Sequence, residues 1–458
     1  MTPTLGDTFV GKAMFKNTVM KFNEIEMPKN VLYAGLTVLL GLSLYFFYMH
    51  IKYPPCCDVV QYINLANIYN SGDILTYKEA GRTFGYPWFL SFVFAIADFI
   101  NIPRSFLMLL VQTAVYFSAI LLICFLASKY SKRLTISVFL LCCCNIYVAP
   151  YFGLALTDSL YTSLCLLFYG MLGYQMLSFR DKGRVSIGSI LLVILLISFA
   201  IIVRPAAVWL VGPYVVTISY VLYHKAASLS GVIVAIVMGT IPLMIQVTMN
   251  FSQFGLFTIF PAISLGDMQI VWGIENIKYG TWMGGGAPQN YYPANAFVDV
   301  SASQSGLIWY ANNPIDGLRL VLVKFIGAFD YDFLSPYPTV KPYFMWLPSI
   351  LSFTVLWVGL SGIFVHLLVK RLPMLGFRFL PFLILICWGA VNLVSALELR
   401  FTLPIVCYFL VVTAVFFDGY WDCFNRLRKF TYIASGALFV TLCIYISVFI
   451  RAQSSIIY

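Results

Sequence analysis

The chain has 458 residues, of which 61% are hydrophobic and 10% are charged, and its mean hydropathy is +0.88. A soluble globular protein of this length does not combine so few charges with so much apolar sequence, so the composition indicates a polytopic membrane protein. The formal net charge is +10. We attribute this charge to orientation in the bilayer, because no basic run or basic-aromatic patch is dense enough to predict a nucleic-acid partner.

Segment 1–30 is polar, contains several lysines and lacks the apolar region and cleavage site of a signal peptide, so we expect it to be cytoplasmic. Windows of ~20 apolar residues predict about 11 transmembrane helices, at 31–51, 105–127, 134–151, 159–178, 186–203, 206–223, 229–249, 346–369, 379–396, 402–417 and 432–450. The expected fold class is an all-α polytopic membrane protein. It divides into a transmembrane core at 31–249, a large external loop with an interfacial helix at 250–345, and C-terminal transmembrane helices at 346–458.

The apolar segment 86–100 decides the topology. If both of its ends lie outside, most Lys and Arg residues between the spans fall on one side of the membrane and most acidic residues on the other, as the positive-inside rule requires. A helix of ~15 residues also reaches only about 22 Å, short of a ~30 Å hydrocarbon core. We therefore expect 86–100 to be a juxtamembrane helix that does not cross, within a first external loop at 52–104.

With this topology, ionisable residues from distant parts of the sequence share the external ends of helices. They are Asp58, Arg82, Asp158, Arg204, Glu398 and Arg400. A charge at the centre of a membrane helix costs about 2.5–3.5 kcal/mol, so charges near a bilayer usually have a function. Structural explanations also exist: Thr157 or Asp158 as a helix N-cap, Arg204 snorkelling, and a local ion pair between Glu398 and Arg400. Their joint placement favours one external site.

Residues 52–90 read KYPPCCDVVQYINLANIYNSGDILTYKEAGRTFGYPWFL. Asp58, a helix with Tyr62 on the same face, a Gly-Asp turn and the RTFGYP motif before an apolar run follow one another in an order that resembles the first extracytoplasmic loop of the GT-C superfamily. These membrane glycosyltransferases use polyprenyl-phosphate sugars and include the protein mannosyltransferases and the lipid A aminoarabinose transferases. The resemblance implies a GT-C fold with extracytoplasmic juxtamembrane helices.

The resemblance also implies roles for individual residues. Asp58 matches the acidic residue proposed as the catalytic base, and Asp158, in LALTDSLYTSL, matches a second acidic motif. Glu398 and Arg400, in SALELRFTLP, resemble an acidic-x-Arg-aromatic-x-x-Pro motif. A guanidinium offers a fixed fork for phosphate oxygens. We therefore assign catalysis to Asp58 and Asp158, donor phosphate binding to Arg82, Lys78, Arg204 and Arg400, and substrate contacts to Tyr62, Glu398 and Lys324.

Departures from the family pattern narrow the expected function. No Asp-Glu pair follows the first span, unlike in protein mannosyltransferases, and RTFGYP replaces a Lys-Pro-Pro form, which argues against an aminoarabinose donor. The remaining pattern resembles bacterial O-antigen glucosyltransferases. It implies transfer of one sugar from a polyprenyl phosphate to a surface glycan or lipid-linked glycan on the periplasmic face of the inner membrane. The alternative is a flippase for lipid-linked glycans, which would place charges near the bilayer midplane and show two related halves.

The cysteines predict neither a metal cage nor a disulfide. Most of the 11 cysteines lie in apolar segments, as in Cys142-Cys143-Cys144, where they pack as small hydrophobes. Cys56 and Cys57 lie outside those segments, and adjacent cysteines rarely pair with each other. The sequence names no cofactor and leaves open a divalent metal at the acidic residues.

Overall fold

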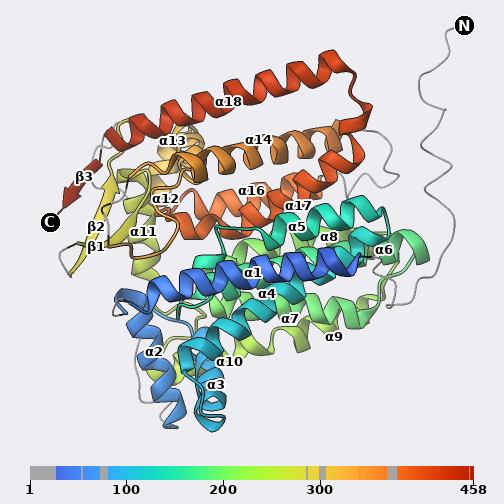
Figure 1. The fold of residues 1–458 in the computed structure, drawn as a ribbon. Helices are drawn as coiled ribbons and strands as arrows, with labels where there is room; N and C mark the ends of the chain where they lie inside the picture. Colours follow the sequence, from blue (N-terminus) through green and yellow to red (C-terminus); the bar gives the residue numbers. More distant parts are fainter. Residues whose placement is uncertain are drawn as a thin grey trace, which may run out of the picture.

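The computed structural model describes residues 27–52, 55–72, 81–284, 287–298, 306–339, 341, 343–368, 379–452 and 454–457. Within these residues the chain is mostly helical (Figure 1). The elements are α1 (Lys29–His50), α2 (Cys57–Asn70), α3 (Gly85–Phe99), α4 (Arg104–Ser128), α5 (Lys132–Cys143), η1 (Ala149–Tyr151), α6 (Thr157–Lys182), α7 (Ile187–Val203), η2 (Pro205–Leu210), α8 (Val211–Tyr223), α9 (Leu229–Gly239), α10 (Ile241–Phe254), α11 (Ile263–Glu275), β1 (Gly280–Gly284), β2 (Ala287–Pro293), α12 (Gly306–Asn312), α13 (Pro314–Gly327), α14 (Trp346–Leu368), α16 (Leu380–Asn392), η3 (Leu399–Thr402), α17 (Leu403–Gly419), η4 (Trp421–Cys423), α18 (Arg426–Ala452) and β3 (Ser454–Ile457).

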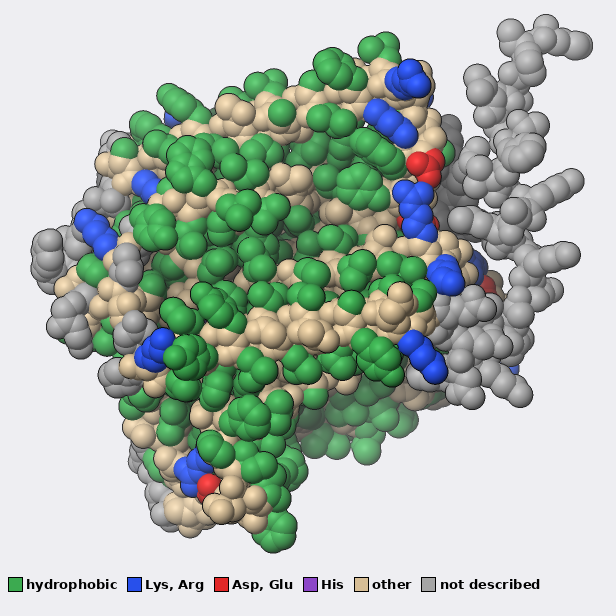
Figure 2. Space-filling model, in the orientation of Figure 1, with side chains coloured by type: hydrophobic (Ala, Val, Ile, Leu, Met, Phe, Trp, Pro, Cys, Tyr) green, Lys and Arg blue, Asp and Glu red, His purple; other side chains and the backbone are tan. Residues whose placement is uncertain are grey.

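The long helices lie side by side between two ends of the molecule (Figure 1). α4 packs on α5 and α6, and α17 packs on α5, α6 and α14. Apolar side chains cover the face of the bundle seen in Figure 2, and the charged side chains on that face lie near the ends. Helices satisfy their own backbone hydrogen bonds, so a bundle with an apolar outer face can be embedded in lipid. The predicted all-α polytopic membrane protein is confirmed.

Each of the 11 predicted spans contains a helix, but the helices differ in length. Among the described residues, 7 helices are long and apolar enough to cross a membrane, and the bent pair α9 and α10 makes up to 8. The remaining predicted spans hold α5, α7 and α16, which have 12, 17 and 13 residues. In the segment 134–151 the α-helix ends at Cys143 and only the short 3-10 helix η1 follows, and in 379–396 the helix ends at Asn392.

The predicted span 229–249 is bent by 41° between α9 and α10. Pro242 lies in the first turn of α10, where it has no backbone N–H to donate to the preceding turn. The helix therefore restarts at Ile241, with Thr240 between the two halves. α10 then ends at Gly255, whose φ of 70° lies in the left-handed region that glycine adopts without a Cβ penalty.

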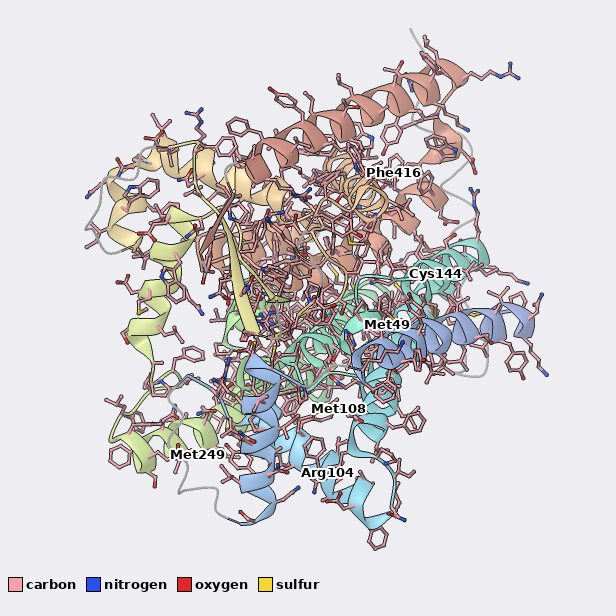
Figure 3. The ribbon with its side chains drawn as sticks, turned by 60° about the vertical axis from the view of Figure 1, so that its left-hand side comes forward. Met49, Arg104, Met108, Cys144, Met249 and Phe416 are labelled. Carbon is pink, nitrogen blue, oxygen red and sulfur yellow. The ribbon has the colours of Figure 1, made fainter. Side chains whose placement is uncertain are left out.

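α2 and α3 lie across one end of the bundle, beside α10 (Figure 1). Gly85 allows α3 to begin against the end of α7, because a Cβ there would lie 2.7 Å from the carbonyl oxygen of Ile202. At the other end of α3, Arg104 pairs with Asp98 at 2.6 Å and donates to Asn67 of α2 at 2.9 Å. Figure 3 turns this end forward and labels Arg104. α3 thus follows α2 and does not run along the bundle.

The loop 250–345 contains α11, α12 and α13 together with a small antiparallel sheet that the sequence did not predict. β1 pairs with β2 in the register Gly280↔Tyr291, and β3 at the end of the chain pairs with β2. The segment predicted to form an interfacial helix is helical, as α13, and its position at the membrane interface stays a prediction.

A buried four-residue cluster ties α18 to this loop: Lys278 Nζ contacts Asp330 at 2.8 Å, Arg451 Nε contacts Asp332 at 2.5 Å, and each cation also pairs with the other acid. The two carboxylates and the two cations neutralise one another, because an unpaired charge buried in the protein would be strongly destabilising.

A group of basic residues lies at the end of the bundle opposite α2, where its members follow α4, begin α5, end α6 and begin α18 (Figures 1 and 2). They include Lys129, Lys132, Arg133, Arg180, Lys182, Arg184, Arg426, Arg428 and Lys429. Segment 1–30 lies mostly outside the described residues. The predicted topology places this end in the cytoplasm, and the side that it faces stays a prediction.

A labelling experiment tests that topology. We expect a cysteine introduced at Arg104 to react with an impermeant maleimide in intact cells, and one at Lys132 to react only after permeabilisation, because α4 separates the two positions along the bundle. The background lacks the native cysteines, and a permeant maleimide controls for accessibility. External labelling of Lys132→Cys without labelling of Arg104→Cys would reverse the orientation.

Candidate active site

A cavity of about 700 Å³ lies at the end of the bundle that carries α2. Its wall comes from the start of α2, the residues before α3, the break between α7 and η2, α11, and the segment between α16 and α17. Asp58, Arg82, Arg204, Glu398 and Arg400 line it, and Thr157, the neighbour of Asp158, lines it too. The fold therefore joins residues from five predicted motifs around one space.

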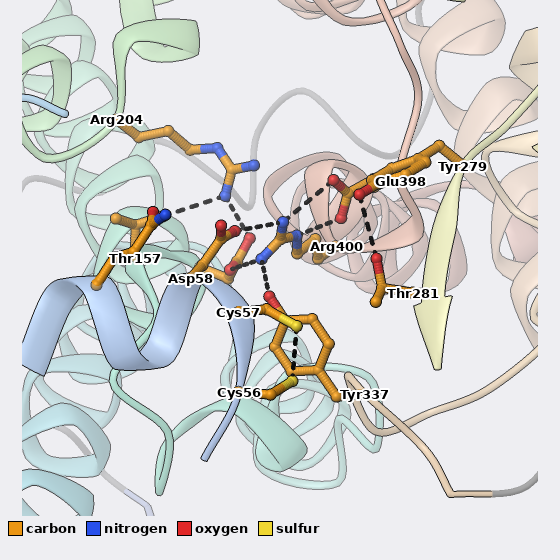
Figure 4. A network of polar contacts seen from close by, with 12 residues as sticks. Cys56, Cys57, Asp58, Thr157, Arg204, Tyr279, Thr281, Tyr337, Glu398 and Arg400 are labelled. Carbon is orange, nitrogen blue, oxygen red and sulfur yellow. Dashed lines mark hydrogen bonds and ion pairs between the residues drawn. The ribbon is translucent and has the colours of Figure 1, made fainter. Parts of the chain in front are cut away.

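Asp58 lies in the first turn of α2, with its carboxylate between two guanidinium groups. Arg82 Nη2 donates to Oδ1 at 2.6 Å, and Arg400 Nη2 donates to Oδ2 at 2.9 Å; Figure 4 shows the contact with Arg400. Burial disfavours the charged form, but Arg400 and then Arg82 outweigh it and lower the pKa of Asp58 to about 2. The side chain is therefore an ionised carboxylate in the cavity wall.

Arg82 is held by α2 on its other side as well. Its Nη2 and Nε donate to Gln61 Oε1 at 2.6 and 3.1 Å, and its guanidinium lies 5.0 Å from the ring centroid of Tyr62. Tyr62 is buried and meets Tyr86 of α3 edge to face at 5.0 Å. The aromatic pair fixes the position of the cation, so Tyr62 acts on the site through Arg82 as well as by lining the cavity.

Asp158 lies in the first turn of α6 and is fully buried. The N-cap prediction is wrong for both residues named in it: the N-cap is Leu156, without a side-chain hydrogen bond, and Thr157 and Asp158 are inside the helix. Asp158 pairs instead with Arg204, which also donates to Thr157 Oγ1 at 3.3 Å and lies 4.1 Å from the ring centroid of Phe401. A carboxylate in the first turn is further favoured by the helix dipole.

Arg400 joins the two aspartates. Besides its bond to Asp58, it contacts Asp158 Oδ2 at 3.7 Å and donates to both oxygens of Glu398, at 2.5 and 3.1 Å (Figure 4). The predicted local pair between Glu398 and Arg400 therefore exists, and Arg400 also reaches across the site. Its Nη1 lies 3.4 Å from the hydroxyl of Tyr337.

The chain leaves the helix to place Glu398 and Arg400. α16 ends at Asn392, and the backbone then hydrogen-bonds to the external loop, from Ala396 N to Gln269 O and from Tyr279 N to Leu397 O, each at 2.7 Å. η3 and α17 follow directly. The external loop thus positions the motif that the sequence assigns to the C-terminal helices.

The six charges balance. Three arginines face three carboxylates, so the group is neutral when all are ionised. An incoming anion must therefore compete with a carboxylate for a guanidinium. Arg82 is the most accessible of the three, with 25% of its side chain exposed, against 11% for Arg204 and 13% for Arg400. Arg82 is thus the guanidinium that an anion in the cavity can reach at the lowest cost in desolvation.

The predicted substrate contact of Lys324 is wrong, because its side chain is fully buried. Its Nζ donates to the carbonyl oxygens of Gly273 and Ser395, at 2.9 and 2.6 Å. A Cβ at position 273 would lie 2.5 Å from the Ser395 backbone and 2.8 Å from Nζ, so glycine permits this close approach. Lys324 holds α11 and α13 against the segment that leads to Glu398. Lys78 lies outside the described residues.

Burial lowers the pKa of Lys324 to about 7, from an ordinary value of 10.5. Between these two pH values the unfolded chain binds a proton that the folded chain does not, so stability rises with pH over this window. We expect wild-type protein in detergent to gain in apparent Tm from pH 7 to about 9 relative to Lys324→Met. The variant also melts lower throughout, because both carbonyls lose their donor. Lys341→Met, at an exposed site, is the control and should parallel wild type.

The donor set does not fit a divalent cation. Among the described residues, no group of three or more His, Cys, Asp or Glu side chains is arranged to hold a metal. Asp58, Asp158 and Glu398 each face at least one guanidinium. A metal would have to displace those arginines, and we derive no step through one.

Several cavity residues were not singled out from the sequence. Gln61 lies one residue before Tyr62 and binds Arg82, while Phe401 follows Arg400 and stacks on Arg204. The sequence could have indicated both residues, because each lies next to a predicted site residue. Tyr279 and Tyr292 stack at 5.2 Å and both line the cavity from the external loop. No pattern in the sequence distinguishes these two from the other aromatic residues of that loop.

Comparison with known proteins gives a structural likeness. No family model and no protein with a curated description matches the chain. The structure is similar to the Archaeoglobus fulgidus oligosaccharyltransferase tethered with an acceptor peptide, with 14% sequence identity and a TM-score of 0.44. The likeness covers 92% of this chain and 55% of that one, so the protein spans about half its length. At this similarity no conclusion follows from the likeness, and function is argued from the site.

Proposed function

We propose that the protein is a GT-C-type glycosyltransferase that moves a single sugar from a polyprenyl-phosphate donor to an acceptor hydroxyl. The observation that carries this proposal is the ionised Asp58 carboxylate held between Arg82 and Arg400 in the wall of the cavity. A carboxylate can receive the acceptor proton, and guanidiniums can receive a leaving phosphate. The end of the bundle suits a donor whose lipid tail stays in the membrane.

Binding of the donor prepares Asp58 for its role. With a pKa near 2 the carboxylate is a weak base, because both guanidiniums favour its charge. A donor phosphate that takes over Arg82 removes one of these partners and raises the affinity of Asp58 for a proton. The acceptor hydroxyl then bonds to the anomeric carbon as the bond to the phosphate oxygen breaks. The proton passes to Asp58, and the phosphate leaves as an anion on the arginines.

The arrangement favours a transferase over a flippase. A transporter binds its substrate near the bilayer midplane, between related halves. The six charges here lie at one end of the bundle, next to the crosswise helices α2 and α3. We place this end on the external face of the plasma membrane, since the Lys and Arg residues that follow α4 and α6 and begin α5 and α18 lie at the other end, where few acidic residues accompany them. The acceptor we propose is a surface glycan or lipid-linked glycan such as O-antigen.

A transfer assay tests the proposal. Purified protein is incubated with radiolabelled polyprenyl-phosphate sugars and candidate acceptor glycans, and label is followed from lipid to glycan. Asp58→Asn protein is the matched control for contaminating enzymes. Transfer by wild type alone is the expected result. Movement of intact lipid-linked glycan across vesicles, without transfer of label, would assign the protein to the flippases.

Alanine variants of Arg82 and Arg204 should differ in how strongly they weaken donor binding. Replacing Arg82 by Ala removes a charge-assisted phosphate contact worth about 1.5–3 kcal/mol, so we expect donor affinity to fall roughly 10- to 100-fold. Arg204→Ala should weaken donor binding less, because its cation is committed to the buried Asp158. Arg104→Ala, which removes an exposed ion pair outside the cavity, is the control. Unchanged donor affinity in both site variants would mean that the phosphate is bound elsewhere.

A further inference from the structure

Two adjacent cysteines before Asp58 turn their sulfur atoms toward each other. The Sγ atoms of Cys56 and Cys57 lie 2.7 Å apart, as the dashed line between them in Figure 4 shows. Neighbouring side chains point about 100° apart in a helix and to opposite faces in a strand, so adjacent sulfurs do not normally meet. Here they meet because Cys56 is extended while Cys57 has a φ of 58°, in the left-handed region.

The backbone of Cys57 distinguishes this pair from the adjacent Cys142 and Cys143. A left-handed backbone is costly for a residue with a Cβ and is uncommon outside glycine, asparagine and aspartate. Cys142 and Cys143 are also adjacent, but both belong to the regular helix α5, which carries their side chains in different directions. Cys56 and Cys57 are partly exposed, whereas Cys142 and Cys143 are buried. The two pairs therefore form a natural comparison within one chain.

We propose that Cys56 and Cys57 form a reversible vicinal disulfide, which closes a ring at the first turn of α2 and fixes the carboxylate of Asp58. The S–S bond forms as each thiol gives up its hydrogen. The two electrons and two protons pass to the disulfide of a thiol–disulfide oxidoreductase, which leaves as two thiols. Disulfides persist on the external side of a membrane. The effect of this bond on catalysis rests on the proposed function, whereas the bond itself does not.

The geometry of adjacent residues makes such a bond easy to reverse. Their Cα atoms are about 3.8 Å apart, below the range of about 4.4–6.8 Å in ordinary disulfides, so the ring is strained and more readily reduced. Burial raises the pKa of Cys57 to about 12 and also raises that of Cys56. The folded thiols are therefore protonated and slow to react, which favours oxidation while the loop is still open.

The ring would act directly on the reacting group. Cys57 precedes Asp58 in the chain, and the φ of Cys57 sets the direction in which α2 begins. The Asp58 carboxylate must fit between Arg82 and Arg400, whose donors lie 2.6 and 2.9 Å away. Both thiols are free in the structure, where Cys57 already has the left-handed backbone. A closed ring would lock this direction, whereas free thiols leave Cys57 able to move to a right-handed or extended backbone. Cys56 and Cys57 are positioning residues for Asp58 in this scheme.

Mass spectrometry of wild-type protein tests the bond without any variant. Intact cells are treated with an alkylating reagent and denatured in its presence, and the peptide carrying both cysteines is analysed before and after reduction. We expect it to escape alkylation and to lack two hydrogen atoms, and to gain two labels after reduction. Cys142 and Cys143 should be alkylated in both samples. Alkylation of Cys56 and Cys57 without reduction, or a bond from either to another thiol, would overturn the proposal.

A rate measurement tests the positioning role. Reductant should slow transfer by wild type at least about threefold, since small displacements of a reacting group are costly, and should leave Cys56→Ser/Cys57→Ser unaffected. Re-oxidation should restore the wild-type rate only. If the mass shows the bond but the wild-type rate is insensitive to reductant, the positioning role is wrong. Absence of any transfer would count against the proposed function and leave the mass result standing.

Discussion

Asp58→Asn should abolish transfer while leaving the fold intact. Loss of a general base typically costs about 10²–10⁴-fold in rate. Asparagine keeps the size of the side chain and one acceptor oxygen, and 26% of the Asp58 side chain is exposed, so we expect the protein to fold. Its amide nitrogen faces one of the two guanidiniums that bond to the carboxylate, so we expect a modest fall in apparent Tm. Turnover is measured by transfer of label, and folding by size-exclusion profile and apparent Tm. Activity within a few fold of wild type would remove Asp58 from catalysis.

Two further measurements sharpen the test. Asp98→Asn changes an exposed aspartate on α3, outside the cavity, and should keep full activity. The pH profile separates free and donor-bound enzyme. The folded pKa of Asp58 is about 2, below its ordinary 3.8, so its contribution to stability is lost only as the pH falls toward 2. In the free enzyme Asp58 is thus ionised between about pH 4 and 7, and kcat/KM, which reports the free enzyme, should show no acid limb there. If Asp58 is the base and donor binding raises its pKa, an acid limb should appear only in kcat, which reports the donor-bound enzyme.

The helical fold and the charged residues that share the site could both be predicted from the sequence, for clear physical reasons. Apolar length identifies membrane helices, and the distribution of Lys and Arg orients them. Together these rules placed Asp58, Arg82, Asp158, Arg204, Glu398 and Arg400 at one end of the bundle, and the structure brings all six together. The order of short motifs added the roles.

The pairing within the site could not be predicted in the same way. Arg400 and Asp58 are 342 positions apart, and nothing local indicates that they share a hydrogen bond. The sequence predicts a substrate contact for Lys324, yet its side chain is completely buried beside Gly273. The third strand of the sheet, β3, comes from the end of the chain, so nothing local indicates that it pairs with β2. Such contacts depend on tertiary packing, which hydropathy does not record.

Arg400→Gln should lose both activity and stability, because this guanidinium serves three carboxylates. It bonds to Asp58 and Glu398 and lies 3.7 Å from Asp158, which is fully buried. Breaking a buried ion pair from one side typically costs about 3–5 kcal/mol, since the remaining charge stays without compensation. We expect a large fall in apparent Tm and no detectable transfer. Arg104→Gln, in an exposed pair, should change neither.

A double variant separates the two losses. Adding Glu398→Gln to Arg400→Gln removes one of the uncompensated carboxylates, so we expect the apparent Tm to recover in part while transfer stays absent. Arg400→Lys keeps the charge but not the planar fork that reaches Asp58 and Glu398 together, so it should fold better than Arg400→Gln and still transfer poorly. If the double variant regains activity together with stability, Arg400 maintains the fold and takes no part in the reaction. If neither recovers, Asp58 and Asp158 alone account for the instability, and the network depends on Arg400 more than on Glu398.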